Sequence, residues 1–266
     1  MRKYWGLAKA TFQEYFTYRL NFILWRFRAV IQLAILFFLW STAFSGQTVV
    51  FGYTQAQMLT YILGVSLIRS YILAARLSEG VGAEIVTGNI TNILLKPMSY
   101  LRYVFSRDLS DKFINIFFSS IEITGFILLF HPPLIWQTQP FYVLSFIASL
   151  LLALMLYFFI NMAISYTAFW LVEDWWAPRF MFGIILDFLA GGLFPVDILP
   201  PIMVKILAFT PFPYILFFPI KIYLGQLSYF QVLQGLGVVL VWTWLAYLLQ
   251  RYTWRKGLRQ YEAIGR

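Results

Sequence analysis

The sequence contains no cysteine and only one histidine among its 266 residues. Disulfides, thiolate metal sites and cysteine nucleophiles are therefore excluded, because each requires a cysteine side chain. The single histidine, His131, precedes two prolines and has no second imidazole with which to share a metal ion or a proton. We interpret it as a loop residue.

Charged residues are also scarce. Asp, Glu, Lys and Arg make up 12% of the chain, whereas hydrophobic residues make up 61% and aromatic residues 21%. A soluble domain carries about 25% charged residues, which it needs to cover its surface. No internal repeat or low-complexity linker divides the chain. The composition therefore predicts an all-α membrane protein that forms a single domain over residues 1–266.

Long apolar runs predict six transmembrane helices. The predicted spans are Phe22–Phe44, Gln57–Ala75, Phe113–Phe130, Phe141–Val172, Arg179–Phe194 and Tyr229–Leu249. The fourth span is longer than one crossing requires, so we expect it to tilt or to project beyond the bilayer. An even number of spans places both termini on the same side of the membrane.

Two further segments have their own patterns. Trp5, Phe12, Phe16 and Leu20 recur at helical spacing, which predicts an N-terminal amphipathic helix at the membrane interface. The stretch Pro195–Leu227 between the fifth and sixth spans is mostly apolar but contains six prolines. Because proline breaks helices and irregular backbone cannot face lipid, we expect a re-entrant segment of short helices.

The basic residues are distributed unevenly along this predicted topology. Of the 20 Lys and Arg residues, 18 lie at the start of the chain, around the connection between spans two and three, at the start of span five or after span six. Only Lys205 and Lys221 lie on the other side. The positive-inside rule then places both termini in the cytoplasm of a multi-pass protein of the plasma (inner) membrane.

The longest charged connection, Leu77–Asp111, contains a short apolar stripe. Ile90, Ile93 and Leu94 follow helical spacing, and Lys96-Pro97 ends the stripe, since the residue before proline avoids the helical conformation. Two interpretations stay open on this pattern. The connection is either a solvated linker or a surface that meets a cytosolic partner.

A family resemblance bears on this choice. The segment Gly88-Asn-Ile-Thr-Asn-Ile-Leu-Leu-Lys-Pro-Met98 resembles the glycine, short helix and Leu-Leu-Arg/Lys-Pro segment of ABC-2 type permease subunits of ABC transporters. The amphipathic start, the six spans, the stretch Gly191–Pro200 and the proline-rich segment also follow the order typical of that family. The similarity extends over essentially the whole chain.

The resemblance implies a coupling helix that docks on a separate ATP-hydrolysing subunit. The residues assigned to it in this way are Gly88, Asn89, Ile90, Ile93, Leu94, Leu95, Lys96 and Pro97. The resemblance also implies that two permease chains, identical or related, pair to enclose a substrate path, and that the complex is an exporter. This chain would hold no cofactor, with ATP and Mg²⁺ bound in the partner subunit.

Motifs for catalysis are missing from the sequence. A P-loop requires a Gly-Lys dipeptide, and none occurs, so conventional ATP hydrolysis would have to come from another polypeptide. No Gly-x-Ser-x-Gly elbow provides an acyl-transfer nucleophile. The basic excess follows the predicted topology, so we expect no nucleic-acid partner. We therefore expect a transport subunit rather than an enzyme.

Three ionisable residues fall inside predicted spans, where an unpaired charge costs several kcal/mol. Arg69 and Glu122 are predicted at similar depths, so we expect them to form an ion pair, with a substrate or proton site as the alternative. Asp187 lies four residues from both Gly183 and Gly191. That spacing places all three on one helical face, which favours a packing or subunit interface.

Two other functions are weighed against the permease. A secondary transporter driven by an ion gradient usually has repeated halves and discontinuous helices around intramembrane charges. A membrane-embedded lipid-modifying enzyme needs a cluster of Asp, Glu, His or Ser near one interface, and only Glu173 and Asp174 stand together. The permease of an ATP-driven exporter is the interpretation we favour.

Overall fold

The computed structural model describes residues 19–74 and 76–261. Trp5, Phe12 and Phe16 of the predicted amphipathic helix lie outside these residues, whereas Leu20 belongs to the first described helix. The elements are α2 (Arg19–Ala43), β1 (Val49–Val50), β2 (Tyr53–Thr54), α3 (Gln55–Ile72), α4 (Arg76–Val86), α5 (Ile90–Leu94), α6 (Tyr100–Phe130), α7 (Pro140–Ser165), η1 (Tyr166–Phe169), α8 (Ala177–Leu189), η2 (Val196–Ile198), α9 (Pro201–Ala208), η3 (Phe212–Tyr214), α10 (Phe217–Tyr223) and α11 (Tyr229–Gln260).

Four helices in the described part of the chain are long and apolar enough to cross a membrane. They cover Phe22–Ala43, Tyr100–Phe130, Pro140–Phe169 and Tyr229–Gln260. The expectation of a mostly helical integral membrane protein is therefore confirmed. Two of the six predicted spans do not reach this standard. α3 carries two glutamines and an arginine among 18 residues, and α8 has 13 residues, about 20 Å of helix against an apolar core of about 30 Å.

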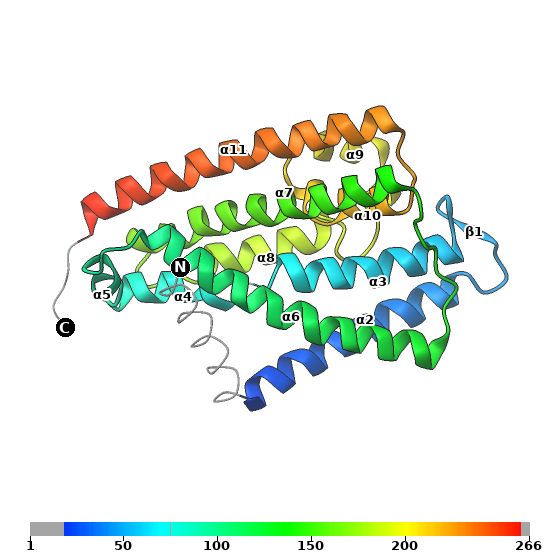
Figure 1. Cartoon of the computed structure of the whole chain (residues 1–266), viewed down its shortest axis with the longest axis horizontal. Coiled ribbons are helices and arrows are strands. Elements are labelled where there is room, and N and C mark those ends of the chain that lie inside the picture. Colours follow the sequence, from blue (N-terminus) through cyan, green and yellow to red (C-terminus); the bar gives the residue numbers. More distant parts are fainter. Residues whose placement is uncertain (1–18, 75, 262–266) are drawn as a thin grey trace.

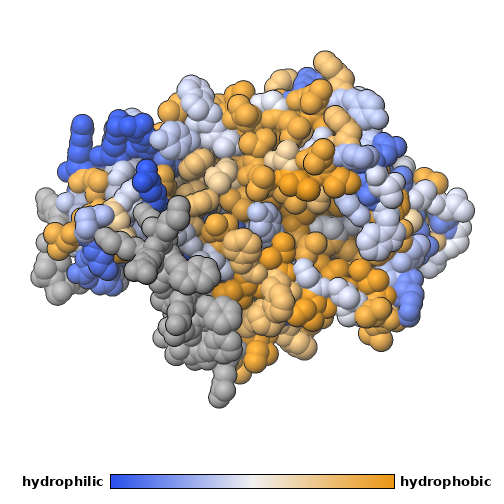
Figure 2. All heavy atoms as spheres, in the orientation of Figure 1, coloured by the Kyte–Doolittle hydropathy of each residue, from blue (hydrophilic) through white to orange (hydrophobic). Residues whose placement is uncertain are grey.

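Most of the longer helices run roughly along the long axis of the molecule, as Figure 1 shows for α2, α3, α6, α7, α8 and α11. One end holds α4, α5 and the last turns of α11, and we call it the α5 end. The other end holds the strands β1 and β2, and we call it the hairpin end. Figure 2 shows a broad hydrophobic surface between the two ends and hydrophilic residues gathered at the ends themselves. This distribution is the one expected of a protein that spans a bilayer.

Local sequence explains several helix boundaries. Capping boxes begin two helices, formed by Thr54 with Gln57 at α3 and by Ser228 with Gln231 at α11. α6 ends at His131, which adopts a left-handed conformation with φ 45° and whose N–H bonds back to Ile127. α6 begins at Tyr100, before the predicted third span, and continues through that span as one helix of 31 residues.

The region between α8 and α11 consists of short helices separated by prolines. Pro201 occupies the first turn of α9, where its missing N–H costs nothing. α10 lies against α3 and α7, and its residue Ile220 is buried. That this region re-enters the membrane stays a prediction.

The connection after α2 contains a small antiparallel hairpin, in which Val50 pairs with Tyr53, and the rest of the regular structure in the described residues is helical. One expectation about local structure is wrong, because the proposed helical face of Gly183, Asp187 and Gly191 does not exist. α8 ends at Leu189, and Gly191 lies in a turn with φ +84°. An added Cβ at Gly183 would meet nothing within 4 Å.

The described residues form two apolar cores. The larger one joins α3 to α2, α7, α10 and α11. The second, which we call the end cluster, lies at the α5 end and comprises Val81, Ile85, Ile90, Ile93, Tyr100, Val104, Phe158, Met162, Tyr166, Ala168 and Phe169. The end cluster joins α4 and α5 to the ends of α6 and α7, so this end of the molecule has a core of its own.

Candidate functional site

The predicted coupling segment forms a short helix that is partly buried in its own chain. α5 covers Ile90–Leu94, and the chain leaves it through Lys96-Pro97. Ile90 is fully buried and Ile93 is 7% exposed, and both belong to the end cluster. By contrast, Leu94 is 39% exposed and Leu95 is 81% exposed. One side of this segment therefore anchors it, and the other side is open.

This arrangement divides the predicted contact residues into a buried group and an exposed group. Ile90 and Ile93 pack inside the chain, so they cannot offer their side chains to a partner in this conformation. The exposed residues of the segment are Asn89, Asn92, Leu94, Leu95, Lys96 and Pro97, and we call them the coupling surface. Helical spacing groups Ile90, Ile93 and Leu94 together, but it does not say which neighbour covers each of them.

Polar contacts hold the segment from behind. Gly88, with φ +75°, turns the chain between α4 and α5. The Tyr261 hydroxyl lies 3.1 Å from Thr91 Oγ1 and donates to the Gly88 carbonyl at 3.4 Å. Tyr261, the residue that follows α11, is therefore hydrogen-bonded both before and within α5.

Aromatic packing around Tyr100 joins the helices next to α5. Tyr100, at the start of α6, donates to Glu84 of α4 at 2.7 Å. Its ring stacks on Trp254 of α11 with a centroid distance of 5.0 Å and an interplanar angle of 4°. α4, α6 and α11 therefore meet around one tyrosine.

Four charged residues of the predicted spans form two ion pairs. Arg26 of α2 binds Glu122 of α6, with Nε donating to Oε1 at 2.6 Å. Arg69 of α3 lies 2.5 Å from Asp187 of α8. The expected pair between Arg69 and Glu122 is therefore wrong, although both residues are indeed paired. Similar depth along two helices does not determine which faces of those helices meet.

Two glycines make room for the second pair. An added Cβ at Gly192 would lie 2.9 Å from Arg69 Nη1 and 3.2 Å from the Asp187 carbonyl oxygen. At Gly191 it would lie 2.5 Å from the Tyr61 hydroxyl, which donates to the Gly191 carbonyl at 2.7 Å. The turn after α8 therefore fits against α3 only because both positions lack a side chain.

Sequence reasoning missed a buried lysine at the α5 end. Lys112 of α6 is fully buried, and its Nζ donates at 2.7 Å to the carbonyls of Ile72 and Ala74, at the end of α3. Asp108, one turn earlier, lies 3.3 Å from the same nitrogen. The Asp-Lys spacing of four residues was the available signal. The lysine satisfies carbonyls that the end of α3 leaves without helical partners.

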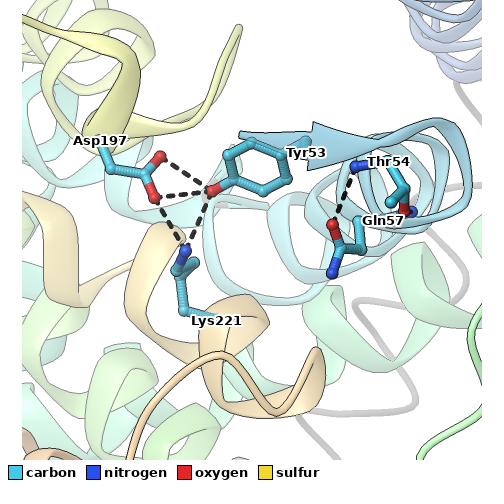
Figure 3. A network of polar contacts seen from close by, with 5 residues as sticks. All are labelled: Tyr53, Thr54, Gln57, Asp197 and Lys221. Atoms are coloured by element: carbon cyan, nitrogen blue, oxygen red, sulfur yellow. Dashed lines mark hydrogen bonds and ion pairs between the residues drawn. The ribbon is translucent and has the colours of Figure 1, made fainter. Parts of the chain in front are cut away.

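A third polar group lies at the hairpin end (Figure 3). Tyr53 of β2 donates to Asp197 of η2 at 2.8 Å, and Lys221 of α10 binds both the same carboxylate at 2.8 Å and the Tyr53 hydroxyl at 3.2 Å. Burial and the Asp197 charge raise the pKa of Tyr53 far above its usual value, so its hydroxyl remains a donor. These contacts join the hairpin to the proline-rich region.

Among the described residues, no group of three or more His, Cys, Asp or Glu side chains could hold a metal ion. The polar side chains described above pair with one another or with backbone groups. These pairs hold neighbouring elements together.

The comparisons with known proteins identify the family. Residues 30–265 match the family described as ABC-2 family transporter protein. No curated protein and no solved structure matches the chain. The match covers nearly all of the described residues, including the coupling surface and the Arg69–Asp187 pair. The chain therefore belongs to the ABC-2 family of transporter membrane proteins.

Proposed function

We propose that this chain is the permease subunit of an ATP-driven exporter and that its coupling surface docks on a separate ATPase subunit. The observation that carries the proposal is that one side of the α5 segment is buried in its own chain and the other side is exposed. Ile90 and Ile93 are fixed in the end cluster, while Leu94 and Leu95 are exposed next to Lys96-Pro97. A helix that transmits force needs both a firm attachment to its own chain and an apolar contact for its partner.

A separate ATPase follows from the chemistry of phosphate binding. The chain lacks the Gly-Lys dipeptide of a P-loop, and family membership supports a membrane component without catalytic activity. ATP and Mg²⁺ would therefore bind in the partner subunit, and this chain would supply the path across the membrane.

The remaining parts of the proposal concern assembly and orientation. Two permease chains, as a homodimer or heterodimer, enclose the path in the plasma (inner) membrane. α3 and α8 act as the second and fifth of six spans, with the re-entrant region between α8 and α11. Both termini and the α5 end face the cytoplasm, which is supported by the 18 basic residues assigned to that side.

Purification of the native complex tests this function. We expect the purified chain alone neither to bind nor to hydrolyse ATP, and the native complex to contain a second polypeptide with Walker motifs. Adding that polypeptide to the reconstituted chain should restore ATP-dependent transport. Robust hydrolysis by the isolated chain, or a native complex with no such subunit, would contradict the proposal.

A further inference from the structure

The last turns of α11 carry four exposed basic side chains: Arg251, Arg255, Lys256 and Arg259. α11 contains no acidic residue from Tyr229 to Gln260. Within residues 19–74 and 76–261, no ion pair joins any of the four to a carboxylate. Among the described residues, the charge of these four side chains is therefore not neutralised by an ion pair.

The four side chains continue the apolar outer face of the same helix. Val241, Trp244 and Leu248 are exposed at helical spacing, and Arg251, Arg255 and Arg259 extend their line. The opposite face is buried, with Ala246 and Gln250 in contact with the rest of the fold and Gly257 against Phe169. Figure 1 shows α11 along the edge of the molecule, so its outer face is not covered by another described element.

A bilayer core that begins at Tyr229 would place the change from apolar to basic at the depth of lipid headgroups. Residues 229–249 provide about 31 Å of helix, which matches an apolar bilayer core of about 30 Å. Tyr252 follows directly, is 56% exposed, and its ring lies 4.8 Å from Lys256 Nζ. An aromatic ring of this kind is typical of the membrane interface.

We propose that the four basic residues of α11 form a binding face for anionic phospholipid headgroups. Guanidinium groups bind phosphate oxygens through paired hydrogen bonds, and clustered cations next to a spanning helix attract anionic lipids. A protein partner is the less favoured occupant, because the face continues the lipid-facing stripe. It also lies roughly 180° around α11 from the residues packed toward the α5 segment. The proposal does not depend on the pairing with an ATPase subunit.

The absence of cysteine allows a direct measurement of local lipid composition. The full chain carrying Leu248→Cys is labelled with a small fluorophore and reconstituted in vesicles of phosphatidylcholine with a minority of phosphatidylglycerol. Bromine is placed on the acyl chains of one lipid or the other, and quenching reports which lipid lies beside the label. We expect phosphatidylglycerol to be enriched beside the label at least about fivefold over its bulk share. A single cation near the surface contributes about 1 kcal/mol, which corresponds to that enrichment.

Two control proteins make the measurement specific. Replacing all four basic residues with Gln should reduce the enrichment to the bulk share, whereas the exposed pair Lys96→Gln and Arg102→Gln at the same end should leave it unchanged. A label at Phe230→Cys, at the other end of α11, should report no enrichment. High salt should weaken the enrichment in the unsubstituted protein, so this result remains informative if the fourfold variant does not fold.

Equal quenching by the two lipids in the unsubstituted protein would overturn the proposal. Enrichment that persists in the folded fourfold variant would do the same, because other features would then attract the lipid. A fourfold variant that loses a protein partner, with no lipid enrichment in the parent protein, would identify the face as a protein contact.

Discussion

The charged side chains between the helices of this protein are held in specific pairs. Arg26 with Glu122 joins α2 to α6, and Arg69 with Asp187 joins α3 to α8. In each pair both side chains are less than one-third exposed. Removing one partner leaves a charge without compensation in an apolar environment, whereas removing both does not. The two pairs therefore act as separate links between helices.

Double-mutant cycles should separate these links. We expect Arg69→Met and Asp187→Leu to be coupled by about 1 kcal/mol or more, because the two side chains are in direct contact. Arg69→Met and Glu122→Leu should be additive within about 0.5 kcal/mol. The measurement is thermal unfolding of the purified protein in detergent. Strong coupling between Arg69 and Glu122 would show that the pairing described here is incorrect.

At the scale of elements, the packing of α11 against η1 depends on one glycine. An added Cβ at Gly257 would lie 2.1 Å from Phe169 Cδ2, so the ring would have to move within the end cluster. Gly237 of the same helix would meet nothing within 4 Å. The two positions therefore form a matched pair within one helix.

We expect Gly257→Ala to destabilise the protein by about 1–3 kcal/mol, because overpacking displaces a buried ring. Gly237→Ala should be neutral or stabilising, since alanine favours helix formation over glycine by about 1 kcal/mol. Thermal unfolding of the two variants provides the comparison. Equal stability of both would contradict the close contact between α11 and η1.

The sequence predicted these elements better than their contacts. Apolar runs located α2, α6, α7 and α11, and Lys96-Pro97 correctly marked the end of α5. Periodicity could not show that Ile90 and Ile93 face their own chain, because burial depends on neighbours that are distant in sequence. The same reason explains the missed Lys112, whose acceptor carbonyls lie some 40 residues earlier.

At the scale of the whole molecule, the polar ends and the apolar middle define a direction across the membrane (Figure 2). Most of the described basic residues lie toward the α5 end, and the positive-inside rule therefore predicts that this end faces the cytoplasm. Asn89 is exposed at the α5 end and Gln47 is exposed at the hairpin end. These positions report on the two sides of the membrane.

Cysteine labelling of intact cells should reveal the orientation. If the hairpin end faces outward as proposed, Gln47→Cys should react with a membrane-impermeant thiol reagent, and Asn89→Cys should react only after the cells are opened. The unsubstituted protein has no cysteine and provides the blank. Ready labelling of Asn89→Cys in intact cells, without labelling of Gln47→Cys, would show that the orientation is the opposite of the one proposed.

The most direct test of the central claim measures binding of the ATPase subunit to the coupling surface. We expect Leu94→Asp combined with Leu95→Asp to weaken that binding by about 2–5 kcal/mol, about thirtyfold or more in affinity, because two charges would be buried against an apolar contact. Val49→Asp, an exposed apolar position at the hairpin end, is the matched control and should bind normally. Pull-down of the ATPase subunit in detergent, with thermal unfolding to verify folding, gives the result. Loss of binding only in the Leu94 and Leu95 variant is predicted, and undiminished binding by that folded variant would contradict the account.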